Sequence, residues 1–393
     1  MKRISILILS IVCLFVNAQD TLTNKDAIYL RPFLFENSFG NTKTAIGGYL
    51  EANTNYFVED GISDGFSLEM RRFNIFLYSK IANKISFISE LEFEHGTEEI
   101  ELETALIDYS FSQAINFRGG VLLVPIGSFN QNHDSPKWDF IDRPLISTTV
   151  IPSTLSEVGF GLHGNINYKN ILLSYEAYIV NGLDDGIINN EIGRTSIPDG
   201  KSKNRFKEDN NGCPSITGKL SFKKANLIEC GLSFYGGVYN TFSIDGLNLD
   251  IKRRINLFAL DANINIKKLS IRTEGAIAFI NVPDGLGNGF GEKQNGLHID
   301  LIYPILTTTF LHWEKTSLNT LFRYEFIDYN VGVFSELESP IYDHVHSVLC
   351  GFSLRVSPSN VLKLNYRYRW DRDIFGNPAV KTAGIQFGFA SYF

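Results

Sequence analysis

Residues 383–393 read Ala-Gly-Ile-Gln-Phe-Gly-Phe-Ala-Ser-Tyr-Phe and end the chain. Large apolar residues occupy alternate positions at Ile385, Phe387, Phe389 and Phe393, and mostly small or polar residues lie between them. A period of two predicts a β-strand. In a soluble protein this strand would leave an apolar edge open to aggregation. A closed membrane barrel has no such edge and turns the apolar face to lipid, so the stretch favours a transmembrane β-barrel.

The composition agrees with a barrel. Aromatic residues make up 13% of the 393 positions, with 31 Phe and 17 Tyr against 2 Met, which suits strands and aromatic girdles. No stretch after residue 18 is apolar for long enough to form a transmembrane helix, so an integral membrane protein of this sequence must cross with strands. The net charge of -7 makes nucleic acid a poor candidate partner.

The N-terminus predicts export. Lys2 and Arg3 precede a short apolar run from Ile4 to Val16, and a small residue, Ala18, ends the segment, which is the pattern of a signal peptide over residues 1–18. Its removal takes away two positive charges, and -7 minus 2 leaves a mature net charge of -9. Residues 19–45 show no sustained period and are interpreted as a periplasmic lead-in that either plugs the barrel or stays outside it. The barrel is predicted over residues 46–393.

About sixteen segments alternate apolar and polar residues over the length that a tilted strand needs to cross a bilayer. They are joined alternately by very short connections, such as Ala82-Asn83 and Lys169-Asn170, and by mostly long ones, such as 126–157 and 183–214. This alternation predicts an all-β, antiparallel transmembrane barrel with short periplasmic turns and long extracellular loops. The alternative is a pair of soluble β-domains. The expected strands are 46–57, 70–81, 84–95, 101–112, 115–125, 158–168, 171–182, 215–224, 227–238, 254–266, 269–281, 296–311, 317–329, 344–356, 360–371 and 382–393, and Pro304 is expected to mark a bulge in the twelfth.

Charged residues share one face of several strands. Because an Arg or Lys facing lipid costs roughly 2–4 kcal/mol, these faces are predicted to point into an aqueous lumen. Both signs of charge occur, so the residues either pair across neighbouring strands or form a ladder that selects anions. The predicted pore-lining residues are Arg72, Arg118, Lys219, Arg272, Arg323, Arg367, Arg369, Glu90, Glu92 and Glu94.

Four motifs follow one another along the chain: Arg71-Arg72-Phe73, the segment Arg118-Gly119-Gly120 that leads to Val124-Pro125-Ile126-Gly127, Ile141-Asp142-Arg143-Pro144, and Val158-Gly159-Phe160 with Asn181-Gly182 at the strand end. In this order they resemble the phosphate-selective porin O and P family. The resemblance covers residues 46–393 and implies a sixteen-stranded outer-membrane barrel, usually trimeric, whose third extracellular loop folds inward. The matching loop here is 126–157. Its charged residues Asp139, Asp142 and Arg143 are the expected constriction if the loop folds inward, and surface groups if it does not.

The sequence therefore favours a passive porin in the outer membrane of a Gram-negative bacterium. Its expected partners are outer-membrane lipid, small hydrophilic solutes or inorganic ions with phosphate among them, and an assembly machinery that reads Phe393. The resemblance adds a homotrimer. No catalytic residue, cofactor or metal site is expected, although His344 and His346 are two residues apart. The alternative function is an adhesin or structural barrel with a blocked lumen.

Overall fold

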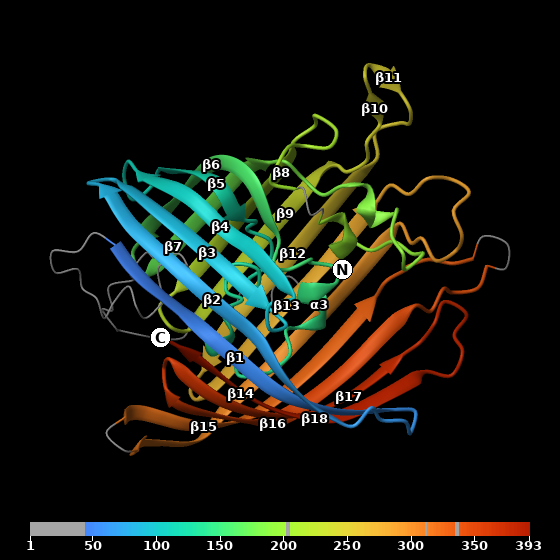
Figure 1. Ribbon diagram of the computed structural model, residues 1–393. Coiled ribbons are helices and arrows are strands. Elements are labelled where there is room, and N and C mark those ends of the chain that lie inside the picture. The colour runs from blue at the N-terminus through green and yellow to red at the C-terminus, as the bar shows by residue number, and fades with distance from the viewer. Residues whose placement is uncertain (1–43, 202–204, 311–312, 335–337) are drawn as a thin grey trace, which may run out of the picture.

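The computed structural model describes residues 44–201, 205–310, 313–334 and 338–393, which form a closed antiparallel barrel (Figure 1). Each of the sixteen wall strands pairs with its neighbours along the chain, and β1 closes on β18, as predicted. The wall strands are β1 (Thr44–Glu59), β2 (Phe66–Ala82), β3 (Ile85–Glu94), β4 (Glu99–Ser110), β5 (Asn116–Leu123), β6 (Ser156–Tyr168), β7 (Ile171–Val180), β8 (Ser215–Lys224), β9 (Ile228–Val238), β12 (Arg254–Ile266), β13 (Leu269–Ile280), β14 (Lys293–Phe310), β15 (Trp313–Asp328), β16 (His344–Ser357), β17 (Asn360–Asp371) and β18 (Val380–Tyr392).

The predicted signal peptide and nearly all of the predicted lead-in lie outside the described residues. The barrel begins at Thr44 rather than at residue 46, because Thr44 and Ala45 already pair with Ser79 and Tyr78 of β2. Ala45 also packs inside the barrel against Tyr49 and Phe76, so the first strand has an apolar anchor at its start.

The last strand closes the barrel as the opening stretch predicts. The register runs from Tyr49 opposite Tyr392 to Glu59 opposite Thr382. Phe393 continues the pairing with two backbone hydrogen bonds to Gly48, and its ring stacks on Phe73 with the ring centroids 5.7 Å apart. Gly48 is required at this crossing, because a Cβ there would lie 2.0 Å from the backbone oxygen of Asn74.

The charged faces of the strands point inward, as predicted. In β17, Lys363 and Asn365 are almost fully buried inside the barrel, whereas Leu362 and Leu364 are exposed on the outside. The same alternation places Glu90 and Glu92 of β3 inside.

Among the register shifts of the described strands, the β-bulges in β2 and β4 break this alternation beside the inner face. In β2, Arg72 pairs with Glu51 and Met70 pairs with Ala52, so Arg71 is an extra residue. In β4, Thr104 pairs with Glu90 and Leu102 pairs with Leu91, so Glu103 is the extra residue. A bulge re-aims a side chain, and here it turns two consecutive residues inward. The bulge expected at Pro304 is also present.

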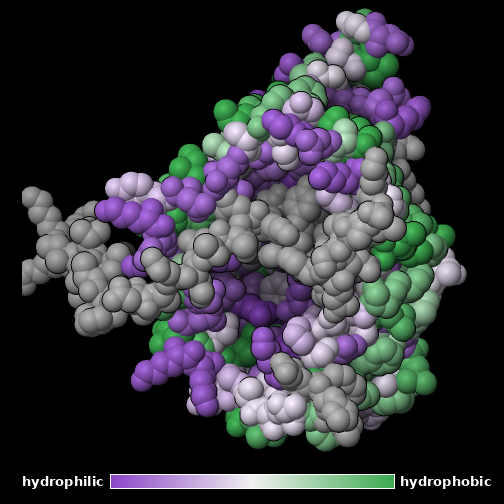
Figure 2. Space-filling model, turned by 90° about the vertical axis from the view of Figure 1, so that its left-hand side faces the viewer, coloured by the Kyte–Doolittle hydropathy of each residue, from purple (hydrophilic) through white to green (hydrophobic). Residues whose placement is uncertain are grey.

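The short turns and the chain end at Phe393 lie at one end of the barrel, on the left of Figure 1. Figure 2 looks onto this end and shows hydrophilic residues around a central hollow. The long loops lie at the opposite end, where a two-stranded hairpin, β10 (Ser243–Ile244) with β11 (Leu247–Asn248), projects from the wall. Among the described residues, the helices are all too short or too polar to span a bilayer.

Candidate constriction site

The connection between β5 and β6 folds into the barrel. It comprises residues 124–155, hereafter the inner loop, rather than the expected 126–157, because β5 ends at Leu123 and β6 begins at Ser156. Asn130 holds the two ends of the loop together: its side-chain amide donates to the backbone oxygens of Val124 and Leu155 and accepts from the N–H of Leu155. The loop contains two short helical turns, η3 (Ser135–Lys137) and α3 (Leu145–Thr148).

Asp142 joins the inner loop to three strands. One carboxylate oxygen lies 3.0 Å from Arg71 of β2 and the other lies 2.8 Å from Arg367 of β17, while Gln386 of β18 donates to the first. Burial by itself would raise the pKa of Asp142, but the two guanidinium groups outweigh it and lower this pKa to about 2. The carboxylate is therefore charged at neutral pH.

A second set of bonds fixes the part of the loop around η3. Asp139 accepts hydrogen bonds from Ser353 and Arg355 of β16. The ammonium group of Lys363 donates to the backbone oxygens of Ser135 and Phe140. Backbone and side chain of the loop are thus both held by the barrel wall.

Glu274 of β13 holds the start of the loop and the short helix α3 at the same carboxylate. Its carboxylate accepts from the backbone N–H of Phe129 at 3.0 Å and from the hydroxyl of Ser147 at 2.7 Å. Gly127, with φ of +65°, allows this approach, because a Cβ at this position would lie 2.5 Å from the Glu274 carboxylate. The glycine that ends the motif Val124-Pro125-Ile126-Gly127 is therefore required by its backbone conformation and by the close approach of Glu274.

One side of the inner loop is apolar and shares a continuous core with the wall and with a second loop, residues 181–214. The expectation of an open aqueous lumen is wrong on this side, near the end that carries the long loops. Burying these aliphatic side chains away from water is more favourable than leaving them in a channel. The core includes Ile126, Ile146, Val150, Ile151 and Leu155 of the inner loop, Leu183, Ile187, Ile188 and Ile197 of the second loop, and Tyr178, Tyr235, Leu257, Ala278 and Ile327 of the wall.

Most of the predicted pore-lining residues form ion pairs inside the barrel. Pairs between neighbouring strands join Arg72 to Glu51, Glu92 and Glu94, Arg118 to Asp108, and Arg323 to Asp300. Lys219 of β8 reaches past β9 to Asp261 of β12, and Arg369 pairs with Asp371 of its own strand. Arg72, Arg118, Arg323, Glu90 and Glu92 are almost completely buried. Arg272 reaches the inner loop, 3.7 Å from Asp139.

A group of five charged side chains keeps access to solvent where the inner loop meets the wall. Their side-chain exposure is 12 to 19%, against 0% for Arg323 and Asp300. The group carries three positive and two negative charges and joins the loop to strands β2, β3 and β17. It consists of Arg71, Arg367, Arg143, Asp142 and Glu94, and we call it the charged ring.

Three of the interior residues that the sequence reasoning missed bear on this site. Arg71 and Glu103 are the extra residues of the two bulges, and strict alternation would have placed them outside. The Arg71-Arg72 doublet was visible as a motif and Arg72 was predicted to point inward, but the inward orientation of Arg71 was not predicted. His133 lies in the inner loop, where no period exists to orient it.

His133, Glu90 and Glu103 form a fully buried group whose possible ligand atoms lie within 4.8 Å of one another. The two carboxylates outweigh the effect of burial, which lowers the pKa of His133, and raise this pKa well above its ordinary value. His344 and His346 are different: they lie among the rings of Phe326, Tyr342 and Trp370 at the rim of the wall.

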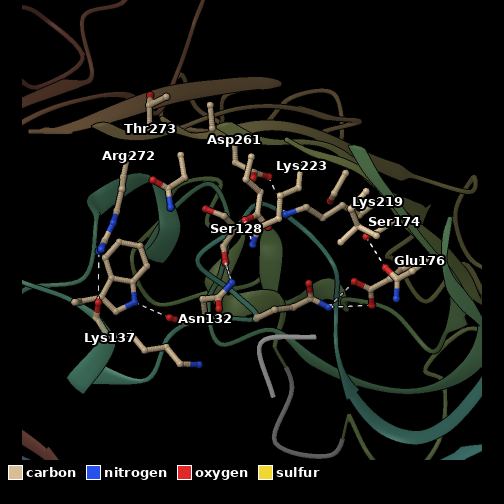
Figure 3. Close-up of a pocket in the computed structure, with 18 of the residues that line it drawn as sticks. Ser128, Asn132, Lys137, Ser174, Glu176, Lys219, Lys223, Asp261, Arg272 and Thr273 are labelled. Atoms are coloured by element: carbon tan, nitrogen blue, oxygen red, sulfur yellow. Dashed lines mark hydrogen bonds and ion pairs between the residues drawn. The ribbon is translucent and has the colours of Figure 1, made fainter. Parts of the chain in front are cut away.

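A polar cavity of about 380 Å³ lies on the other side of the inner loop, toward the short turns. Figure 3 shows its labelled side chains, which come from the inner loop and from strands β7, β8, β12 and β13. Lys219 and Asp261 form an ion pair of 2.8 Å in its wall, and Gln131 of the loop donates to Glu176. The lining contains Lys137, Lys219, Lys223, Arg272, Glu176, Glu229 and Asp261, so it mixes both signs of charge.

This closed sixteen-stranded barrel is similar in fold to several outer-membrane proteins of known structure. The chain is similar in fold to the outer-membrane channel DcaP of Acinetobacter baumannii, with a TM-score of 0.56 and 11% identity over 88% of this chain and 96% of that one. It is also similar to OmpF of Salmonella typhi in complex with daunomycin, with a TM-score of 0.55 and 10% identity over 90% and 99% of the two chains. The trimer form of OmpT, an outer membrane protein of Vibrio cholerae, gives a TM-score of 0.53 at 10% identity over 89% and 99% of the two chains.

In sequence, the chain is 29% identical over 361 residues to an uncharacterized protein of Aquifex aeolicus (strain VF5), a match that covers 84% of this chain and 78% of that protein. No family model matches the chain. The resemblance to the phosphate-selective porin O and P family therefore stays a prediction, and the structural likeness shows the porin fold.

Proposed function

We propose that this protein is a passive outer-membrane channel for small hydrophilic solutes and ions, and that the passage runs through the charged ring. This proposal rests on the difference between the two sides of the inner loop, one apolar and closed and the other charged and partly exposed to solvent. On one side, aliphatic residues of two loops and the wall form a core from which water is excluded. On the other side, Arg71, Asp142 and Arg367 keep partial access to solvent.

The proposed passage is narrow, because the charged side chains span the distance from wall to loop in direct contact. It admits inorganic ions and small polar molecules rather than large ones. The three positive and two negative charges of the ring give a net charge of +1, so we propose a weak preference for anions, phosphate among them. The predicted pore-lining pairs elsewhere on the wall keep the interior polar.

We propose that residues 1–18 are removed on export, that residues 19–43 stay in the periplasm, and that the assembly machinery recognises the terminal Phe393. The ring of Phe393 is exposed beside Phe73 at the end with the short turns, which supports such recognition. A homotrimer is supported by the likeness to a trimeric outer-membrane protein. We assign no catalysed reaction to the chain.

Planar-bilayer recording tests the proposed function. The refolded protein is expected to give small single-channel current steps, with a reversal potential in a salt gradient that shows a weak preference for anions. A clear preference for cations would contradict the role of the charged ring.

A second candidate function is a closed barrel whose long loops bind a partner at the cell surface. It is favoured by the number of wall strands that hold the inner loop, since bonds reach it from β2, β13, β16, β17 and β18. A closed barrel would give no current steps in the same recording, so one experiment separates the two candidates.

A further inference from the structure

We propose that Glu90, Glu103 and His133 bind a divalent transition-metal ion that joins the inner loop to strands β3 and β4. The site goes beyond the proposed channel function and does not depend on it. Glu90 lies on β3, Glu103 is the bulged residue of β4, and His133 comes from the loop. All three side chains are fully buried.

The imidazole has the orientation of a metal ligand. Nδ1 of His133 lies 2.9 Å from the backbone oxygen of Asn130, so Nδ1 carries the proton and donates it to this oxygen. Nε2 then points at the two carboxylates, 2.8 Å from Glu103 and 3.6 Å from Glu90. Metal-binding histidines are held in this way, with the second ring nitrogen bonded to a carbonyl or carboxylate.

The two separations from the imidazole nitrogen nearly fit an ion, and all three possible ligand atoms lie within 4.8 Å of one another. With metal–ligand distances of about 2.0–2.1 Å, two ligands of a tetrahedral ion lie about 3.4 Å apart. The separation between His133 and Glu90 already has this size, and His133 and Glu103 need to move apart by about half an ångström. Two acceptors near Glu90, the side-chain oxygens of Asn74 and Thr104, are buried and have no hydrogen-bond partner among the described residues, which gives the ion a source for a fourth ligand.

The surrounding charge also favours a divalent cation. Glu90 and Glu103 place two carboxylates against the imidazole. A protonated His133 supplies a single positive charge to this pair. A divalent ion bound to a neutral His133 supplies two, so it compensates the two carboxylates more completely. Farther out, Glu51, Glu92 and Glu94 face the cations Arg71, Arg72, Arg143 and Lys363.

The nature of the ligands selects the class of ion. One imidazole nitrogen with carboxylate oxygens suits zinc or another first-row transition metal, whereas magnesium and calcium prefer oxygen ligands alone. Three protein ligands from three segments would hold the loop against the wall more firmly than the ion pair does.

The test is metal retention by the refolded full chain. Protein unfolded in urea with a chelator is refolded into detergent with Zn²⁺, separated from free ion by gel filtration, and its zinc content is measured. The wild type is expected to retain one zinc per chain, and both Glu90→Gln and His133→Ala are expected to lose it. The matched control is His163→Ala, which removes another buried imidazole of the barrel interior, one that contacts Asp108, and should retain the metal.

A second measurement covers variants that fold poorly. Zn²⁺ should raise the urea midpoint of unfolding of the wild type, and Glu90→Gln, which keeps the side-chain shape, should show no such increase. If the wild type retains no zinc, or if Glu90→Gln retains as much as the wild type, the group is only a buried ion pair. Equal retention of Mg²⁺ would contradict the role of the imidazole. None of these outcomes alters the current steps expected of the channel.

Discussion

Replacing Asp142 with Asn tests how the inner loop is held and what it does to permeating ions. The substitution keeps the shape of the side chain but removes the negative charge between Arg71 and Arg367. A carboxylate whose pKa falls from 3.8 to about 2 on folding contributes about 2 kcal/mol of stability above pH 4. Because this group is largely buried, we expect Asp142→Asn to lower the free energy of unfolding by about that amount.

The dependence on pH has a definite direction. The folded pKa of Asp142 is lower than its unfolded value, so its contribution is complete above about pH 4 and is lost as the pH falls toward 2. The difference in urea-unfolding free energy between wild type and Asp142→Asn should therefore be constant near neutral pH and shrink toward zero in acid.

The same substitution changes the charge of the proposed passage. The charged ring goes from three positive and two negative charges to three positive and one negative, so its net charge rises from +1 to +2. The reversal potential in a salt gradient should move toward stronger anion preference. Asp250→Asn is the matched control, since Asp250 pairs with Arg253 in an outer loop and carries the same charge. Equal stability of wild type and Asp142→Asn at neutral pH, with an unchanged reversal potential, would refute this account of the loop.

Three other changes test the proposed passage and the closing of the barrel. Arg143→Glu should move the reversal potential toward cations, because Arg143 faces Glu92 and Glu94, and an unchanged value would mean that Arg143 lies outside the passage. Gly48→Ala should lower the yield of folded barrel, measured as the heat-modifiable band on a gel, because its Cβ would lie 2.0 Å from a backbone oxygen of β2. Deleting Phe393 should reduce assembly in cells far more than it changes the conductance of the barrels that form, and normal assembly of the deletion would remove its role as a signal.

The barrel could be predicted from the sequence because its rules are local. Alternation of Leu362, Lys363, Leu364 and Asn365 records which face meets lipid, and the alternation of short and long connections records which rim each loop occupies. Residues that face lipid and residues that face the interior alternate along each strand, so the pattern is visible within a single segment. Sixteen strands could therefore be counted without knowing any long-range contact.

The interior could not be predicted in the same way. Bulges at Arg71 and Glu103 reverse the expected orientation of one residue each, and nothing in a single strand shows the register of its partner. The inner loop has no period, so the positions of His133 and Asp142 depend on contacts with strands 30 or more residues away in sequence. The resemblance to a family with an inward loop suggested where this segment goes, but not that its aliphatic side would form a core.

In the proposed channel, ions pass beside the charged ring and not through the aliphatic side of the inner loop. Single-channel recording of Arg367→Cys, in a chain whose Cys213, Cys230 and Cys350 are replaced by serine, tests this route during addition of a bulky charged thiol reagent. Arg367 lines the proposed passage, whereas Ala278, the comparison site for a second cysteine, is fully buried in the aliphatic core. We predict that the reagent reduces the current step of Arg367→Cys and leaves that of Ala278→Cys unchanged. Current steps that the reagent leaves unaltered at Arg367→Cys, or no steps before its addition, would contradict the account.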